Sequence, residues 1–248
     1  GNYLAQDRTD VRVAVKELSR RMSAPKECDW TSARRLGRYL INKSRSVLHF
    51  GYQEWQAGVT VWNDTDFAGC RDERKSTSGG VIMFGDHCLK SWSLTQKVIA
   101  LSSGEAEYYG LVKSGSQGLG IRALLGDLGV ECSVTLNIDA SAAIDIASRR
   151  GLGKVRHIEV SQMWLQQRVA NGDLIVQKVD GASNLADALT KHLGKNSLVG
   201  HMESVRFEIR DGRHSLMPIC DSADKAEVGA AVCIESDERL CQVALANI

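Results

Sequence analysis

The hydrophobic period of the chain changes at Val59, and this change constrains the fold more than any other feature of the sequence. Before Val59, apolar residues recur at helical spacing. After it come three short apolar runs, separated by clusters of Gly, Asp and Ser, at residues 59–62, 80–84 and 88–92. Runs of this length and spacing predict three strands of an antiparallel meander.

The pattern after the third run alternates between helices and strands. Residues 104–128 predict a long helix, although the glycines at 110, 115, 118 and 120 oppose this because each costs about 1 kcal/mol relative to Ala. Its expected inner residues are Ala106, Leu111, Ile121, Leu124, Leu125 and Leu128. The later elements are a strand at 134–138, helices at 141–149 and 158–170, a strand at 174–179 and a helix at 184–192. This order predicts an α/β fold with a mixed five-stranded sheet flanked by helices, its first three strands antiparallel.

Two helices are expected before the sheet. Thr9 or Asp10 can cap the first, and Asp29 can cap the second, which begins at Trp30. The expected inward residues of the second are Trp30, Ala33, Gly37, Leu40 and Ile41. Arg34, Arg35 and Arg38 then share the opposite side, where they either follow a nucleic-acid backbone or form an ordinary solvated face.

Composition narrows the class of protein. A chain of 248 residues, 43% hydrophobic, can bury a core, and its seven cysteines contain no CxxC pair that would indicate a zinc site or a disulfide framework. No apolar run is long enough for a membrane span, and no secretory signal is visible. We therefore expect an intracellular protein without a membrane partner. Because the chain begins with Gly1, we also expect a fragment or a processed product.

Charge is unevenly distributed along the chain. Residues 1–50 hold eleven Lys or Arg against five Asp or Glu, whereas residues 201–248 hold five against nine. Beyond residue 197 the pattern loosens: residues 205–209 alternate as in a strand, and residues 227–248 fit either a helix or disorder. A basic start and an acidic tail predict separate roles for the two ends.

Four acidic residues stand out by their positions: Asp64 after the first strand, Glu107 early in the long helix, Asp139 after the fourth strand and Asp187 in the last helix. Taken singly, each is explained by a turn, a helix cap or the helix dipole. If the first and fourth strands are neighbours, the four carboxylates converge. Such a cluster would repel itself unless it held hard divalent cations, and Mg²⁺ is the expected ion.

Six segments carry a resemblance to a known family. They are NDTDFAG (63–69), RKSTSGG (74–80), IALSSGEAEYYGL (99–111), NIDASAAI (137–144), VRHIEV (155–160) and LADALTK (185–191). In order and spacing they resemble the RNase H domain of the Pol polyprotein of copia-type LTR retrotransposons. The region before them resembles the thumb or connection segment of that family's reverse transcriptase. The resemblance implies a connector at 1–50, an RNase H-like domain at 55–195 and a C-terminal tail at 196–248.

The resemblance implies a ribonuclease that cuts the RNA strand of RNA–DNA hybrids to leave a 5′-phosphate and a 3′-hydroxyl. Two Mg²⁺ ions about 4 Å apart, with Mn²⁺ as a substitute, would flank the scissile phosphate. Asp64 would bridge them, Asp187 would help to hold the ion that activates water, and Glu107 and Asp139 would help to hold the other. Asp66 and Glu105 match the family pattern but are not its usual ligands. The implied partners are the hybrid and the polymerase part of the polyprotein, in a cytoplasmic particle or the nucleus.

The turn predicted within RKSTSGG supplies further candidates for nucleic-acid contact. These are Lys75, Ser76, Thr77 and Ser78, whose hydroxyls could read the 2′-hydroxyls of RNA. A plain turn between two strands is the competing interpretation.

Several features depart from the family pattern. The family's usual Asp-Asn-Gln-Ser-Ala is Asp139-Ala140-Ser141-Ala142-Ala143 here, and residues 177–179 lack the His that many RNases H carry before the last Asp. We interpret His157 as structural and His192 as a helix-end residue. No Tyr-x-Asp-Asp polymerase signature is present. These departures leave open a decayed or co-opted nucleic-acid-binding module, and the acidic tail leaves open an interaction scaffold.

Overall fold

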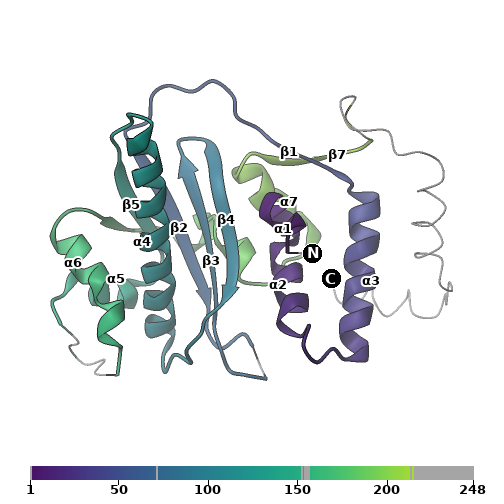
Figure 1. Ribbon diagram of the computed structural model, residues 1–248, viewed down its shortest axis with the longest axis horizontal. Helices are drawn as coiled ribbons and strands as arrows, with labels where there is room; N and C mark the ends of the chain where they lie inside the picture. Colours follow the sequence, from purple (N-terminus) through teal and green to yellow (C-terminus); the bar gives the residue numbers. More distant parts are fainter. Residues whose placement is uncertain (1, 71, 152, 154–156, 213, 215–248) are drawn as a thin grey trace.

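The computed structural model describes residues 2–70, 72–151, 153, 157–212 and 214. Its main sheet has the order β4-β3-β2-β5-β6 (Figure 1). The strands are β2 (Gly58–Asp66), β3 (Thr77–Phe84), β4 (His87–Thr95), β5 (Ser133–Ile138) and β6 (Ile175–Lys178). β2, β3 and β4 pair antiparallel, while β5 lies parallel to β2 and β6 parallel to β5. The predicted mixed sheet and its antiparallel meander are confirmed.

The first hairpin is longer than predicted, because its polar residues continue the strands. Asp64 pairs with Gly79 and Asp66 with Thr77, so Asp64 lies inside β2 rather than after it. Thr77 and Ser78 likewise belong to β3, and the prediction of a turn through these two residues is wrong. The ladder extends because side chains of both hydroxyl residues find partners inside the protein.

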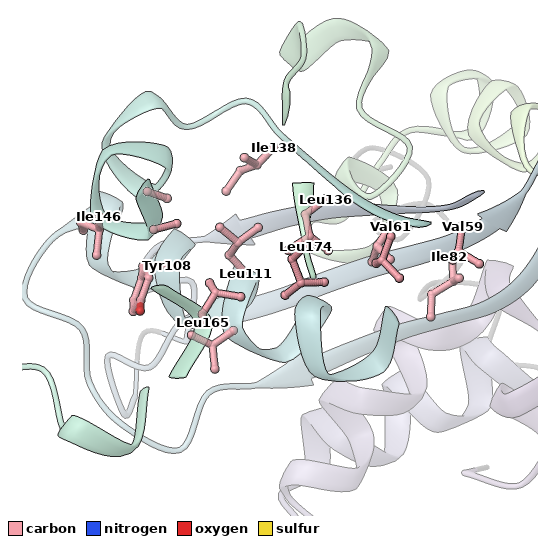
Figure 2. Close-up of a cluster of buried hydrophobic side chains, with 14 of the residues drawn as sticks. Val59, Val61, Ile82, Tyr108, Leu111, Leu136, Ile138, Ile146, Leu165 and Leu174 are labelled. Atoms are coloured by element: carbon pink, nitrogen blue, oxygen red, sulfur yellow. The ribbon is translucent and has the colours of Figure 1, made fainter. Parts of the chain in front are cut away.

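One face of the sheet is covered by α4 (Ser103–Asp127), α5 (Ser141–Ser148) and α6 (Trp164–Ala170) (Figure 1). The apolar residues between them and the strands form the main core, including Val61, Leu111, Leu136 and Leu165 (Figure 2). The long helix is confirmed, and its glycines have a packing reason. A Cβ at Gly118 would lie 2.7 Å from the Val134 side chain, so glycine permits close contact with the sheet.

Some predicted inner positions and helix bounds are wrong. Leu124 and Leu128 are more than half exposed, because the end of α4 extends past the core. In place of one helix at 158–170, a 3₁₀ turn, η2 (Val160–Gln162), precedes α6. The Gln162 carbonyl there accepts a hydrogen bond from the Tyr108 hydroxyl at 2.8 Å.

The other face of the sheet is covered by segments predicted in part as tail. α7 (Lys195–Ser204) leads to β7 (Phe207–Arg210), which pairs antiparallel with β1 (Arg45–Leu48). Met202, Val205 and Phe207 pack with Val81 and Met83 of β3 in a second core. The strand predicted at 205–209 is therefore confirmed, and α7 and β7, which lie mostly within the predicted tail, help to bury this core.

The helix predicted at 184–192 is absent from that described stretch. One short 3₁₀ turn, η4 (Asp187–Leu189), lies in that stretch, and another, η3 (Gly181–Ser183), directly precedes it. Asn184 donates from Nδ2 to the Asn63 carbonyl at 2.8 Å, and Thr190 donates to Asp64. Such side-chain bonds compete with a continuous helix and explain why it does not form.

The N-terminal segment folds as α1 (Leu4–Asp7), η1 (Thr9–Val11), α2 (Arg12–Arg20) and α3 (Glu27–Asn42). The predicted caps are wrong. Thr9 Oγ1 lies 3.0 Å from Ser91 Oγ, and Asp10 accepts from Arg8 and from the Tyr39 hydroxyl. Asp29 accepts from the Lys26 amide at 2.8 Å, because α3 begins three residues earlier than predicted.

The buried side of α3 also differs from the prediction. Leu36, Tyr39 and Leu40 pack against the small core of Ala5, Val11 and Val15. Trp30 and Ile41 are more than half exposed. The sequence of α3 does not by itself determine which of its neighbouring apolar stripes is buried. Packing against the segments that precede it determines which side of α3 faces the core.

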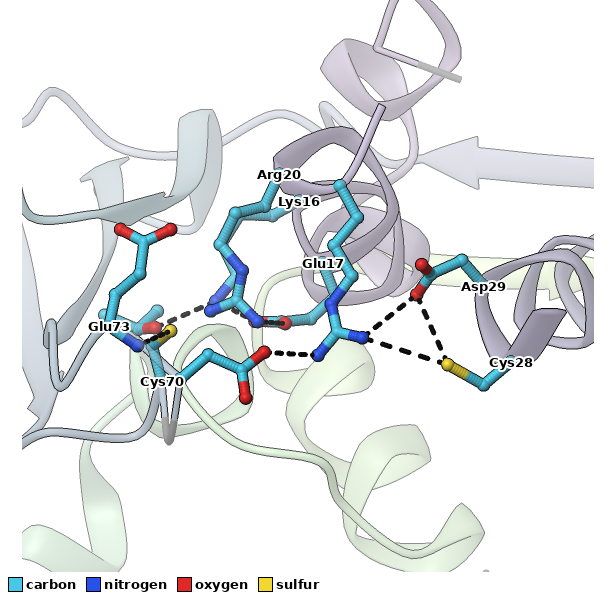
Figure 3. A network of polar contacts seen from close by, with 10 residues as sticks. Lys16, Glu17, Arg20, Cys28, Asp29, Cys70 and Glu73 are labelled. Atoms are coloured by element: carbon cyan, nitrogen blue, oxygen red, sulfur yellow. Dashed lines mark hydrogen bonds and ion pairs between the residues drawn. The ribbon is translucent and has the colours of Figure 1, made fainter. Parts of the chain in front are cut away.

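Polar contacts attach α2 to the main sheet and to the β2–β3 hairpin. Arg12 Nε donates to Ser91 Oγ of β4 at 2.7 Å, and Lys16 Nζ donates to Thr77 Oγ1 of β3 at 2.8 Å. Arg21 bridges Asp29 of α3, at 3.4 Å, and Asp72 of the hairpin, at 2.9 Å (Figure 3). The N-terminal helices are thus fixed beside the edge strand β4.

None of the helices among the described residues is both long enough and apolar enough to cross a membrane. Cys28, Cys70, Cys88 and Cys132 are free thiols. The expectations for residues 227–248, and most of the acidic tail, lie outside the described residues.

Candidate active site

Asp64 is buried in the central strand β2, where its carboxylate has one neutral and one charged neighbour. The Thr190 hydroxyl donates to Oδ2, and Lys191 Nζ lies 4.0 Å from the same oxygen. Burial raises the pKa of Asp64, while the Thr190 bond and the Lys191 charge act in the opposite direction. A buried carboxylate with so few donors retains the capacity to bind a cation.

Glu107 points from the first turns of α4 toward the same point and is held by neutral donors. The Thr65 amide donates to Oε1 at 3.2 Å, and Asn63 Nδ2 donates to Oε2 at 3.4 Å. Asn63 is itself fixed, since Ser114 donates to its Oδ1 at 2.8 Å. Burial, followed by the charges of Asp64 and Asp139, raises the pKa of Glu107 to about 9.

Asp139 follows β5, the parallel neighbour of β2, and is partly exposed. Gly181 lies against it: a Cβ there would be 2.9 Å from Asp139 Oδ2. Gly181 thus leaves room for the carboxylate at the edge of the site.

Three of the four predicted ligands meet. One carboxylate oxygen from each of Asp64, Glu107 and Asp139 lies within 4.8 Å of the others. They come together because β2 and β5 are neighbours and α4 begins beside the same end of the sheet. The set fits a hard divalent cation, since all donors are oxygens and Glu107 has only neutral hydrogen-bond partners.

Asp187, the fourth predicted ligand, lies in η4 and is partly exposed. It does not join the group of three; the Lys191 ammonium donates to its Oδ1. The sequence patterns did not indicate that Thr190 and Lys191 touch this site. A usable signal was present in LADALTK, where Lys191 follows Asp187 by four residues, a common spacing for ion pairs.

The nearby acidic residues Asp66 and Glu105 lie outside the group of three. The buried Glu105 carboxylate accepts from the Leu101 amide at 2.9 Å and the Tyr109 hydroxyl at 2.8 Å, and its Oε2 lies 2.7 Å from His157 Nε2. Burial opposes ionisation, but these bonds prevail and lower the pKa of Glu105. His157 therefore has a structural contact, as expected, and His192 is exposed.

The predicted nucleic-acid residues fall into two sets. Arg34, Arg35 and Arg38 are exposed on α3, and the Arg34 guanidinium lies 5.5 Å from the centre of the Trp30 ring. The second set is largely engaged inside the protein. Lys75 pairs with Glu73 at 2.5 Å, and Ser76, Thr77 and Ser78 are buried, with their hydroxyls accepting from the Ala68 amide, Lys16 and Gln96. These hydroxyls offer little surface to a ligand.

Replacing Glu107 with Gln is expected to stabilise the metal-free protein by up to about 5 kcal/mol at pH 8. Because the folded-state pKa is raised, the folded protein keeps a proton that the unfolded chain loses, and wild-type stability falls as pH rises from about 4.5 toward 9. Glu107→Gln should lack this fall in urea unfolding with EDTA at pH 5, 7 and 9. Glu131→Gln, at an exposed carboxylate, is the control, and equal pH profiles for wild type and Glu107→Gln would contradict the assignment.

Comparison with known proteins gives relatives for most of the chain. The Pol polyprotein from transposon TNT 1-94 of Nicotiana tabacum is 30% identical over 191 residues, 76% of this chain. That from transposon RE2 of Arabidopsis thaliana is 31% identical over 196 residues, 78% of this chain. The chain spans only 14% and 13% of these two relatives. No protein-family model matches.

The solved structures to which the chain is similar include RNases H. An N-terminal RNase H domain from Mycobacterium tuberculosis has a TM-score of 0.40 and 19% identity, and the match covers 60% of this chain and 99% of that one. LC11-RNase H1 in complex with RNA/DNA hybrid has a TM-score of 0.37 and 17% identity, over 53% and 92%.

The order and directions of the five strands, with acidic residues on β2, α4 and the end of β5, define a domain of the RNase H-like fold. The relatives narrow this class further. The chain is homologous to the retrovirus-related Pol polyproteins of copia-type transposons and matches one segment of those longer proteins.

Proposed function

We propose that this chain is a ribonuclease H, which hydrolyses the RNA strand of RNA–DNA hybrids as part of a retrotransposon reverse transcriptase. One observation carries the proposal: carboxylates from β2, α4 and the end of β5 place oxygens within 4.8 Å of one another. Gathered carboxylates repel one another and resist ionisation, and a bound divalent cation offsets that repulsion. The Pol relatives support the same assignment.

Each residue of the site has a defined task in this proposal. Asp64, Glu107 and Asp139 hold a divalent cation, for which Mg²⁺ is the expected ion and Mn²⁺ a substitute. Asn63 and the Thr65 amide orient Glu107, and Thr190 orients Asp64. A bound divalent cation supplies charge stabilisation at the phosphoryl oxygens and a lower pKa for its water. Asp187 is proposed as the fourth ligand, for a second ion.

The proposed domains follow from the same assignment. Residues 1–50 are proposed as the connector to the polymerase part of the polyprotein, and residues 55–195 as the RNase H-like domain. α7 and β7 complete it by covering β3 and pairing with β1. The proposed setting is intracellular, in a cytoplasmic particle or the nucleus.

The test of the proposed function is cleavage of a labelled RNA–DNA hybrid with Mg²⁺, beside matched RNA and DNA duplexes and a reaction with EDTA. Shortening of only the RNA strand of the hybrid, abolished by EDTA, is the expected result. A hybrid that is bound but stays intact would instead support the decayed or co-opted binding module.

The exposed arginines of α3 are expected to contribute to binding by neutralising phosphates. Replacing Arg34, Arg35 and Arg38 with Gln should reduce the slope of log affinity against log salt by about 0.7–0.9 for each phosphate that the variant no longer neutralises. Binding of the hybrid at several salt concentrations in EDTA measures the slope. Lys113→Gln, at an exposed residue of α4, controls for loss of surface charge, and an unchanged slope in the triple variant would show that α3 lies outside the nucleic-acid interface.

A further inference from the structure

Lys191 places an ammonium group beside the candidate active site. It donates to Asp187 Oδ1, and its Nζ lies 4.0 Å from Asp64 Oδ2. We propose that Lys191 is a built-in competitor of the second divalent cation: it occupies Asp187 in the metal-free protein and must leave before that ion binds. This inference rests on the proposed function and adds a regulator of the same site.

The local backbone brings Lys191 to this position. η4 presents Asp187, and the next two residues after Leu189 return toward β2. Thr190 Oγ1 donates to the Asp64 carboxylate and lies 3.1 Å from the Asp187 carbonyl oxygen, so the turn is fixed on both sides. The next side chain, that of Lys191, therefore lies near the carboxylates of both Asp64 and Asp187.

The exposed fractions of the Lys191 and Asp64 side chains show which of the two can move. The Lys191 side chain is 47% exposed, whereas that of Asp64 is 6% exposed. An ammonium on a flexible stem can turn into solvent without disturbing the fold. Asp64 has no such freedom, because it lies within a paired strand.

Because the Lys191 ammonium and a divalent cation are both positively charged, they cannot both bind Asp187. In the metal-free protein the ammonium offsets the negative charges of Asp64 and Asp187, which otherwise repel each other. A divalent cation bound to Asp187 would lie close to the same ammonium and be repelled by it. Lys191 donates directly to Asp187, whereas its Nζ lies 4.0 Å from the Asp64 member of the three converging carboxylates, so it opposes an ion bound by those three less strongly. The first ion is therefore expected to bind more tightly than the second.

Mn²⁺ binding to the full chain, measured by electron paramagnetic resonance without nucleic acid, tests the competition. Lys191→Met keeps the length of the side chain and removes its charge. We expect the dissociation constant of the second ion to fall by about tenfold in Lys191→Met, because the repulsion between the ammonium and that ion is removed. Lys191→Arg should retain the weak second site, and Lys113→Met, which removes an exposed charge on α4, should resemble wild type.

Thermal unfolding gives a second readout that does not depend on activity. In EDTA, Lys191→Met should melt below wild type, since the carboxylates lose their counter-charge, and saturating Mn²⁺ should remove the difference. Equal second-ion affinities in wild type and Lys191→Met would overturn this inference alone. If wild type bound no divalent cation at all, the proposed function would fail with it.

Discussion

Asp64→Asn is expected to reduce cleavage of the RNA strand by at least about 1,000-fold, while the protein stays folded and still binds the hybrid. Asp64 is the central member of the cluster, on the middle strand, and an amide oxygen is a much weaker cation ligand than a carboxylate. The fold should persist because Asn keeps an oxygen that can accept from Thr190. Single-turnover cleavage of a labelled hybrid with saturating Mg²⁺ measures the loss.

Asp66→Asn is the matched control for Asp64→Asn, since it makes the same change two residues along β2. Asp66 lies outside the group of three converging carboxylates, so its variant should cleave at close to the wild-type rate. If both variants lost activity equally, the effect would be one of general charge and Asp64 would lose its special role. If Asp64→Asn kept activity, the cluster would not be the catalytic centre.

Phe207→Ala is expected to destabilise the protein by about 3–5 kcal/mol. Phe207 is buried between β7 and the sheet, where it packs with Val81 and Met83, and it pairs with Leu48 of β1. Its removal leaves a cavity in the second core. The free energy of unfolding from urea titration measures the loss.

Glu208→Gln, on the same strand but exposed, controls for Phe207→Ala. Its ion pairs with Arg210 and His49 are at the surface and screened by solvent, so stability should change little. A loss as small as this in Phe207→Ala would show that β7 is an accessory to the fold. The sequence-based boundary at residue 195 would then stand.

The sequence predicts the sheet and most of the site because both depend on local patterns. Alternating apolar runs indicate the strands, and strand ends indicate where Asp64 and Asp139 can meet. The same patterns end the first strand too early, so they place Asp64 after β2 rather than within it. In a sequence, polar residues that continue a strand look the same as polar residues that form a turn. Thr77 and Ser78 of RKSTSGG were predicted in a turn rather than in β3 for the same reason.

The features that the sequence did not predict depend on contacts between distant segments. The pairing of β1 with β7 joins a segment before the main sheet to one after it, and neither four-residue strand has a pattern strong enough to indicate its partner. Lys191 also enters the site through tertiary structure, because Thr190 is fixed by a bond to Asp64 on β2. The four glycines that argued against the long helix include three, Gly110, Gly115 and Gly118, that contact neighbouring side chains closely.

The pairing of β1 with β7 also has a consequence for synthesis. A ribosome releases the chain from its N-terminus, and β1 precedes the whole main sheet while β7 follows it. The hydrogen-bonding edge of β1 therefore stays unpaired until β7, the last described strand, has been synthesised. Contacts this distant in sequence form slowly. A polyprotein cut between β6 and β7 would leave both the β1 edge and the apolar surface of β3 uncovered, and such edges promote aggregation.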